Sequence, residues 1–304
     1  MAHNPARGFS FALSGTSILA ITTFVLAKYA LRPDGGFPPA LFALGWTASS
    51  SLFLLLGLAA RGRLRQLRLP RAAAGHVLVA GLIGGVAHIL FWSGLARLDP
   101  SLTAFLMRFS PVLVILLSAV FLGERLSGLE VAGVGLMVAG GCVSSLGDWG
   151  SSDLRAGVIL ILLCCAAASV WRILIKARSH HVHPMVGNFY RLALAALVIA
   201  PWAAASGASA AGVAADSWGV LLLGSLLGPC IGMSLTFNSY RYWDLSKTSM
   251  VMMVQPLIVV PVAAFMPQSS LTLVQFVGGM IILAGGLWVV WQHSRAGRRT
   301  REEQ

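Results

Sequence analysis

The stretch DPSLTAFLMRFSPVLVILLSAVFLGERLSGLEVAGVGLMVAGG, residues 99–141, decides the fold, because it recurs as residues 244–286, DLSKTSMVMMVQPLIVVPVAAFMPQSSLTLVQFVGGMIILAGG. Proline and glycine are the residues that a helix interior tolerates least, and both types recur in one ungapped register. We interpret this recurrence as an internal duplication. The identical pairs include Asp99 and Asp244, Ser101 and Ser246, Thr103 and Thr248, Met107 and Met252, Pro111 and Pro256, Leu126 and Leu271, Gly133 and Gly278, Gly140 and Gly285, and Gly141 and Gly286.

The composition predicts a lipid environment for both copies. Of the 304 residues, 57% are apolar and 11% are charged, whereas soluble domains are about half apolar and about a quarter charged. The mean hydropathy is +0.80. The net charge of +12 lies in short basic clusters between long apolar runs, which is typical of polytopic membrane proteins and not of nucleic-acid-binding faces. We therefore expect the lipid bilayer as a partner and no nucleic acid.

The apolar runs predict an all-α integral membrane protein with ten transmembrane helices. About 20 apolar residues are needed to span the hydrocarbon layer as a helix, and lipid leaves no partner for unpaired backbone groups. Each run reaches about that length, and the linkers between them are short. The predicted spans are 9–31, 38–60, 73–96, 101–121, 127–147, 154–176, 184–205, 217–240, 246–266 and 270–292.

The positions of Lys and Arg predict the orientation. With the N-terminus inside, fifteen of these residues lie in cytoplasmic segments, including the run from Arg61 to Arg71. Only Lys28, Arg32, Arg97 and Arg155 lie on the opposite side. Because cytoplasmic loops carry the excess of basic residues, both termini are predicted to be cytoplasmic. We expect a multi-pass protein of the cytoplasmic (inner) membrane.

The duplication and the odd number of spans in each copy together predict inverted repeats. Five spans per half force the second half to cross the bilayer in the opposite sense. The predicted units are a first five-helix repeat at 1–148, a second at 149–294 and a basic cytoplasmic tail at 295–304. Inverted repeats are typical of secondary transporters, which bind substrate near mid-membrane between the halves.

The segment from Ser101 to Pro111, followed by Leu122-Gly-Glu-Arg125 and the spaced glycines of the fifth span, resembles the EamA-type family of the drug/metabolite transporter superfamily. The resemblance covers essentially the whole chain. It implies ten spans in a five-plus-five arrangement and transport of small metabolites. Two positions depart from the family pattern: Ser14-Gly15 replaces the usual Trp-Gly, and Ser269 replaces the second-half Glu. The family has many substrates, so the resemblance does not name one.

Polar and helix-breaking residues inside the spans are the candidates for a substrate site. Pro111 and Pro256 are expected to kink their spans beside a cavity. Arg108 lies three residues before Pro111, and a charge at membrane depth is a functional hypothesis. We expect its guanidinium to be unpaired and to point between the halves, with Gln255 opposite; reaching the headgroup layer stays open as the alternative. The candidate cavity residues are Arg108, Pro111, His88, Trp92, Asn238, Tyr240, Gln255 and Pro256.

Other residues are interpreted structurally. Glu124 is expected to cap the fifth span, and the glycines to allow close helix contact. Lys28, Arg172 and Arg191 lie nearer to span ends, where long cationic side chains reach the headgroups. The structural glycines are Gly133, Gly140, Gly141, Gly278, Gly285 and Gly286.

The sequence favours an anionic substrate. No Asp or Glu lies in the middle of a predicted span, so Arg108 has no fixed counter-charge and a carboxylate proton relay is missing. Proton coupling through His88 stays open. The four cysteines lie inside apolar runs, and His180, His181 and His183 have no carboxylate or Cys partners. We therefore predict no metal and no cofactor.

We predict a secondary transporter, not an enzyme, with a small metabolite such as an amino acid or another small organic ion as substrate and export as the direction. An intramembrane enzyme needs a nucleophile–base pair or paired acids at membrane depth, and the spans contain neither pattern. A non-transporting membrane subunit is the other alternative, which the short loops disfavour. The sequence leaves open the substrate, import as the alternative to export, the coupling ion and whether the chain forms a homodimer.

Overall fold

The fold was analysed in a computed structural model. It describes residues 5–122, 128–145, 152–177, 182–239, 242, 248, 251–266 and 271–302. All regular secondary structure in these residues is helical. Glu124 and Tyr240, two of the residues singled out above, lie outside the described residues.

The described helices coincide with the apolar runs of the sequence. Seven of them are long and apolar enough to cross a membrane, and two shorter apolar helices cover Pro100–Val114 and Gly128–Ser144. The predicted span 246–266 is described only in part. The elements are α1 Pro5–Leu19, η1 Ala20–Leu26, α2 Ala27–Ala30, α3 Pro39–Ala60, η2 Leu64–Leu67, α4 Arg71–Arg97, α5 Pro100–Leu106, α6 Phe109–Leu122, α7 Gly128–Ser145, α8 Ser152–Ala177, α9 Pro184–Ala205, α10 Ala215–Ser225, η3 Leu226–Gly232, α11 Met233–Ser239, α13 Gln255–Ala263 and α14 Leu273–Glu302.

The fourth predicted span is two helices instead of one kinked helix. The chain turns at Met107 and Arg108, between α5 and α6, and Pro111 is the third residue of α6. The backbone N–H of Arg108 donates to the carbonyl of Phe105 at 3.0 Å, an i to i−3 bond that tightens the turn. A proline ring clashes with the carbonyl four residues earlier, which here belongs to Met107. The clash explains why the helix breaks before the proline and not at it.

A matching turn precedes the second proline. Met253 and Val254 form a turn directly before α13, in which Pro256 is the second residue. The N–H of Val254 donates to the carbonyl of Val251 at 3.1 Å. The two turns lie within one residue of corresponding places in the two copies, and α5 packs against α13. The broken segments of the two copies therefore meet inside the molecule.

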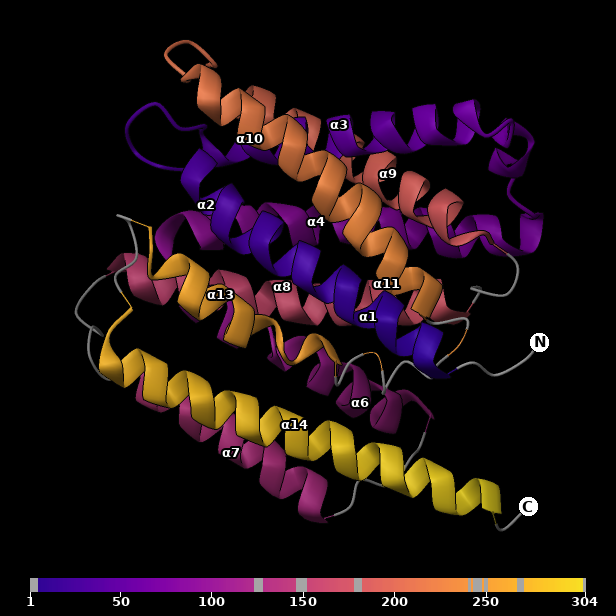
Figure 1. The fold of residues 1–304 in the computed structure, drawn as a ribbon, viewed down its shortest axis with the longest axis vertical. Coiled ribbons are helices and arrows are strands. Elements are labelled where there is room, and N and C mark those ends of the chain that lie inside the picture. The colour runs from indigo at the N-terminus through magenta and orange to yellow at the C-terminus, as the bar shows by residue number, and fades with distance from the viewer. Residues whose placement is uncertain are drawn as a thin grey trace.

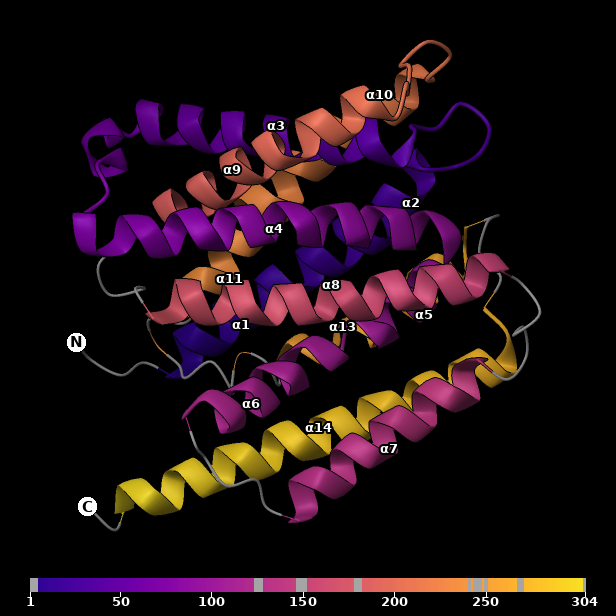
Figure 2. The same cartoon turned by 180° about the vertical axis from the view of Figure 1, so that it is seen from behind.

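The helices form a stack, with α3 and α10 towards one edge and the pair α7 and α14 at the other (Figures 1 and 2). Between these edges α4 packs on α8 and α9, and α1 packs on α11 and η3. Four glycines bring α7 and α14 together. A Cβ on Gly133 would lie 3.2 Å from the carbonyl oxygen of Gly285, and one on Gly140 would lie 2.7 Å from that of Gly278. These reciprocal contacts show that the two helices cross in antiparallel directions at their backbones.

The remaining two glycines have more space. A Cβ on Gly141 would meet the Phe109 ring at 3.7 Å, an ordinary contact distance. A Cβ on Gly286 would lie 3.2 Å from the flexible end of Met253. Close approach of the two backbones is therefore a property of Gly133, Gly140, Gly278 and Gly285.

The two ends of the stack differ in charge. The arginine-rich turn around η2 lies at the same end as the start of α1 and the end of α14, on the right in Figure 1. The opposite end carries an ion pair between Arg32, after α2, and Asp216, in α10: the Arg32 Nη2 atom lies 2.8 Å from Oδ1 and 2.9 Å from Oδ2. The Tyr29 hydroxyl donates to the same carboxylate at 2.6 Å. These bonds join the first span to the eighth.

Candidate functional site

A cavity in the middle of the stack is lined by residues of both sequence copies. Its volume is about 130 Å³, close to the roughly 150 Å³ void that accommodates one benzene molecule. Arginine, histidine, aromatic and methionine side chains form much of its wall. The lining residues are Leu19, Thr23, Phe24, Trp46, Ala87, His88, Phe91, Trp92, Met107, Arg108, Cys164, Ala168, Trp171, Arg172, Arg191, Pro229, Met233, Met252 and Gln255.

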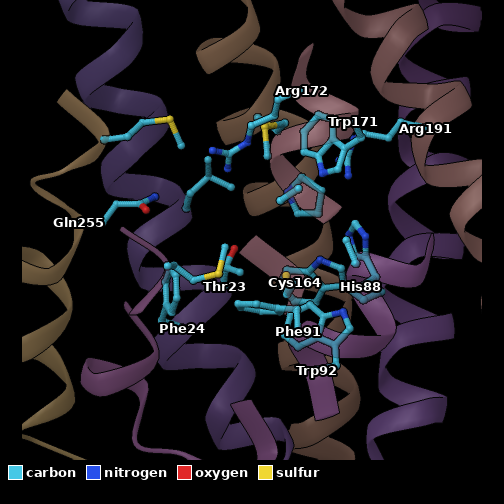
Figure 3. Close-up of a pocket in the computed structure, with 18 of the residues that line it drawn as sticks. Thr23, Phe24, His88, Phe91, Trp92, Cys164, Trp171, Arg172, Arg191 and Gln255 are labelled. Atoms are coloured by element: carbon cyan, nitrogen blue, oxygen red, sulfur yellow. The ribbon is translucent and has the colours of Figure 1, made fainter. Parts of the chain in front are cut away.

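Two arginines and a tryptophan form one end of the cavity. Figure 3 shows Arg172, Trp171 and Arg191 gathered there, with Gln255 on the opposite wall. The Arg191 guanidinium carbon lies 5.0 Å from the centre of the Trp171 ring and that of Arg172 lies 5.7 Å from it. Such cation–π contacts hold a guanidinium over a ring face without neutralising its charge. We refer to Arg172, Trp171 and Arg191 as the cationic end.

Each of these arginines has a neutral hydrogen-bond partner. Arg191 is 2% exposed, and its Nη2 donates to the Asn188 side-chain oxygen at 2.9 Å. Asn188 lies one turn earlier on α9 and is itself fixed by donating to the Pro229 carbonyl at 2.7 Å. Arg172 donates from Nη1 to the Ser110 hydroxyl at 3.2 Å. The neighbouring helices therefore orient both guanidinium groups and leave their positive charge in place.

Arg108 bridges the two broken segments. Its Nε donates to the Ala104 carbonyl at 3.0 Å, its Nη2 donates to Gln255 Oε1 at 2.6 Å, and its Nη1 donates to the Met252 carbonyl. The expectation of an unpaired guanidinium is therefore wrong, although all three acceptors are neutral. The side chain is 3% exposed, so the headgroup alternative is wrong as well.

Aromatic rings form the other end of the cavity. Phe24, Phe91 and Trp92 gather at the end opposite the cationic end in Figure 3. Phe91 packs edge-on against Phe24 and Trp92, with ring centres 5.8 Å and 4.8 Å apart. Trp46 completes the cluster beside Trp92 at 5.2 Å. We refer to Phe24, Phe91, Trp92 and Trp46 as the aromatic end.

Two further polar groups line the cavity: His88 on the wall between the two ends, and the indole N–H of Trp92 within the aromatic end. His88 Nδ1 lies 2.7 Å from the Gly84 carbonyl, so this nitrogen carries a hydrogen and Nε2 is the nitrogen left for other partners. The indole Nε1 of Trp92 is buried and has no hydrogen-bond partner among the described residues. A buried donor left unpaired is unfavourable, and an acceptor on a bound molecule would satisfy it.

The structure brings together four of the residues singled out from the sequence. Arg108, His88, Trp92 and Gln255 line the cavity. Pro111, Pro256 and Asn238 are outside the lining. The two prolines shape the turns that position Arg108 and Gln255, and Asn238 lies half-buried in α11.

The expectation that Arg172 and Arg191 reach the headgroups is wrong. Arg172 and Arg191 point into the cavity, and Lys28 donates to the carbonyls of Leu95 and Ala96 at 2.9 Å each, at the end of α4. One sequence signal could have identified Arg172. Lys176 already supplies a basic residue at the cytoplasmic end of the same span. The positive-inside rule therefore does not account for a second basic residue, Arg172, one turn deeper in the membrane.

Comparison with known proteins places this chain in a family. The profile of the EamA-like transporter family matches residues 7–146 and, separately, residues 155–291. The pseudopaline exporter CntI of Pseudomonas aeruginosa is 28% identical over 188 residues, 61% of this chain and 64% of that exporter. The aromatic amino acid exporter YddG of Ancylobacter novellus is 29% identical over 197 residues, 63% of this chain and 66% of that exporter. Both alignments cover less than two thirds of the exporter.

The fold has a counterpart among solved structures. One crystal structure superposes with a TM-score of 0.62 at 22% sequence identity and covers 94% of this chain and 98% of that chain. The match extends over both sequence copies. Since the family profile also covers most of the chain and the helices are long and apolar enough to cross a membrane, the protein belongs to the EamA-like transporter family of multi-pass membrane transporters.

Proposed function

We propose that the protein exports small organic ions across the cytoplasmic membrane by alternating access between two inverted halves. The halves are residues 1–148 and 149–294, each with five spans, and 295–304 form a basic cytoplasmic tail. Both termini are cytoplasmic in this proposal. The two separate matches of one family profile support the division of the chain.

Symmetry in the helix packing supports the inversion. The fourth span packs on the ninth through α5 and α13, and the fifth packs on the tenth through α7 and α14. The third span packs on the sixth through α4 and α8, and the eighth packs on the first through α11 and α1. Exchanging the halves maps the contact between the fourth and ninth spans onto itself, and likewise that between the fifth and tenth. It maps the contact between the third and sixth spans onto that between the eighth and first. The antiparallel glycine crossing of α7 and α14 behaves in the same way.

The observation that carries the function is the cavity between the halves, with arginines at one end and aromatic rings at the other. Its residues come from both copies, so movement of one half against the other changes the access to it. Mixed polar and aromatic walls suit a small organic molecule with a charged group. We propose Arg108, His88, Trp92 and Gln255 as substrate-site residues, together with Trp171, Arg172 and Arg191.

The named relatives support the direction and the kind of substrate. One is named an exporter of pseudopaline and the other an exporter of aromatic amino acids. An aromatic body fits the ring-lined end of this cavity, and a carboxylate fits the guanidinium groups, whose planar fork matches it. We therefore propose small aromatic compounds with a carboxylate, both amino acids and other organic anions, as the first substrates to test.

Counterflow in proteoliposomes tests the proposal. Purified protein is reconstituted, the vesicles are loaded with an unlabelled member of a panel of amino acids and organic acids, and uptake of the labelled compound is followed. We expect counterflow of at least one aromatic member, absent from protein-free vesicles. Absence of counterflow for the whole panel, with protein shown to be folded by size-exclusion chromatography, would contradict the proposed function.

A further inference from the structure

The charges of the cavity narrow the substrate class. Building on the proposed function, we infer that the substrate is an organic anion with a ring-sized apolar body and no ammonium group, and that the membrane potential drives its export. The inference distinguishes this protein from a carrier of zwitterionic amino acids. It depends on the guanidinium groups, on their neutral partners and on the order of the two ends of the cavity.

The three guanidinium groups keep their full positive charge. Arg108, Arg172 and Arg191 all line the cavity, and their bonded acceptors in the described part of the chain are carbonyl, amide and hydroxyl oxygens. Neutral acceptors satisfy the N–H groups but do not offset the charge. Arginine does not release its proton in proteins, so the cavity stays positive at physiological pH.

A positive cavity favours an anion and opposes an ammonium group. Charges interact more strongly in a low-dielectric interior than in water, and a buried charge is unfavourable without a partner of opposite sign. A carboxylate supplies that partner. The ammonium group of an amino acid would lie beside like charges, and the described lining offers it no Asp or Glu. A carbonyl in place of the ammonium is neutral and has no such repulsion.

The two ends set the orientation of the bound molecule. Arg172 and Arg191 lie at one end of the cavity, and Phe24, Phe91 and Trp92 lie at the other (Figure 3). Arg172 is one turn from Lys176, near the end of α8 that the proposed topology places on the cytoplasmic side. The carboxylate would therefore be held on the cytoplasmic side and the apolar body would point outward.

The charge of the substrate supplies the driving force. Moving one elementary charge across 100 mV changes the free energy by about 2.3 kcal/mol, which corresponds to a concentration ratio of about 50-fold. A cell interior is negative, so a monoanion moves outward down the electrical gradient. The arginines hold their protons throughout, and the described lining contains no carboxyl group to carry a proton in the opposite direction. His88 is the lining side chain through which a proton could move instead, and a pH gradient applied at zero potential tests that route.

A matched pair of compounds tests the inference. Phenylpyruvate and phenylalanine share the ring and the carboxylate and differ in a carbonyl or an ammonium group. Proteoliposomes loaded with either compound receive an inside-negative potential of about 100 mV from a potassium gradient and valinomycin. We expect phenylpyruvate to leave until its outside-to-inside ratio approaches about 50-fold, with reversed potential reversing the flow. Phenylalanine should move at least ten-fold more slowly and without response to the potential.

The outcomes separate this inference from the proposed function. Equal or faster movement of phenylalanine would overturn the inference and leave the transporter function intact. Movement of phenylpyruvate that follows a pH gradient at zero potential, and ignores the potential, would overturn the driving force. Movement of neither compound, while another member of the panel shows counterflow, would overturn the inferred substrate class. Absence of counterflow for every compound would instead contradict the proposed function.

Substitutions at Arg172 provide a second measurement. Arg172 is half-buried and bonds only the Ser110 hydroxyl among the described residues, so its replacement removes charge with little loss of packing. We expect Arg172→Gln to raise the KM for phenylpyruvate about ten-fold and Arg172→Lys to restore most of the affinity. Arg155→Gln, at an exposed position of α8, is the matched control. An unchanged KM in Arg172→Gln would remove this residue from the anion site.

Discussion

Arg108 and Gln255 join the two halves of the molecule, with Arg108 Nη2 donating to Gln255 Oε1 at 2.6 Å. Each residue lies just before the proline of its own copy, Pro111 or Pro256. Pro256 has no N–H to offer the Met252 carbonyl four residues earlier, and Arg108 Nη1 donates to that carbonyl instead. The helix break in one half is therefore stabilised by a side chain from the break in the other.

Replacing Arg108 should reduce transport in a graded way. Arg108→Ala leaves the carbonyls of Ala104 and Met252 and the Gln255 side chain without their donor, and hydrogen bonds to charged groups contribute about 1.5–3 kcal/mol each. We expect at least a ten-fold loss of counterflow in Arg108→Ala. Arg108→Lys keeps the charge but cannot reach all three acceptors, so we expect an intermediate rate.

Counterflow in proteoliposomes measures the effect, with size-exclusion chromatography to verify folding. Arg155→Ala, on the exposed face of α8, should transport normally. Normal transport by Arg108→Ala would exclude the residue from both the site and the inter-half bridge.

Two adjacent glycines of α7 should differ in their response to alanine. A Cβ at position 140 would lie 2.7 Å from backbone atoms of Gly278 and Ile282, which cannot move without separating the helices. A Cβ at position 141 has 3.7 Å to the Phe109 ring. We expect Gly140→Ala to lower the melting temperature in detergent by several degrees and Gly141→Ala to leave it unchanged. Equal melting temperatures for the two variants would refute the close crossing.

Reporter fusions should detect the two ends of the stack on opposite sides of the membrane. The arginine-rich turn and the segment 206–214 lie at opposite ends in Figure 1. A fusion after Arg65 should report a cytoplasmic location, because basic residues are retained on that side, and one after Ser209 should report an external location. The reversed pattern at either site would invalidate the proposed orientation.

Loss of the Asp216 carboxylate should favour opening at the external end. Asp216 holds Arg32 and Tyr29, which ties the first span to the eighth, and a conformation open at this end must release these bonds. The Asp216 side chain is 48% exposed, and exposed ion pairs contribute up to about 1 kcal/mol. We therefore expect Asp216→Asn to increase the outward-open population by up to about five-fold.

Labelling of a single cysteine in the cavity measures this population. Thr23→Cys in a background without native cysteines would react faster with a membrane-impermeant thiol reagent added outside when Asp216→Asn is present. Asp153→Asn is the control, because its pair with Arg97 spans 4.0 Å and Asp153 is 84% exposed. A labelling rate unaffected by Asp216→Asn would show that the pair does not control access.

The apolar runs and the recurring prolines and glycines by themselves predicted much of the architecture. Whether a segment forms a membrane-spanning helix depends on its own length and composition, since each helix must satisfy its own backbone hydrogen bonds in lipid. The prediction of a helical membrane transporter is confirmed by the helices of the structure and by the family match over both halves. The pairing of Arg108 with Gln255 could also be anticipated, because the duplication places their segments at corresponding positions.

Which cations face the cavity was decided only by the tertiary structure. Lys28, Arg172 and Arg191 look alike in sequence, as basic residues near span ends. Lys28 donates to the carbonyls at the end of α4. Arg172 and Arg191 instead donate to Ser110 and Asn188 and lie beside Trp171 in the cavity wall. A side chain within reach of both headgroups and cavity goes where neighbouring helices present acceptors, and hydropathy along one helix carries no information about those neighbours.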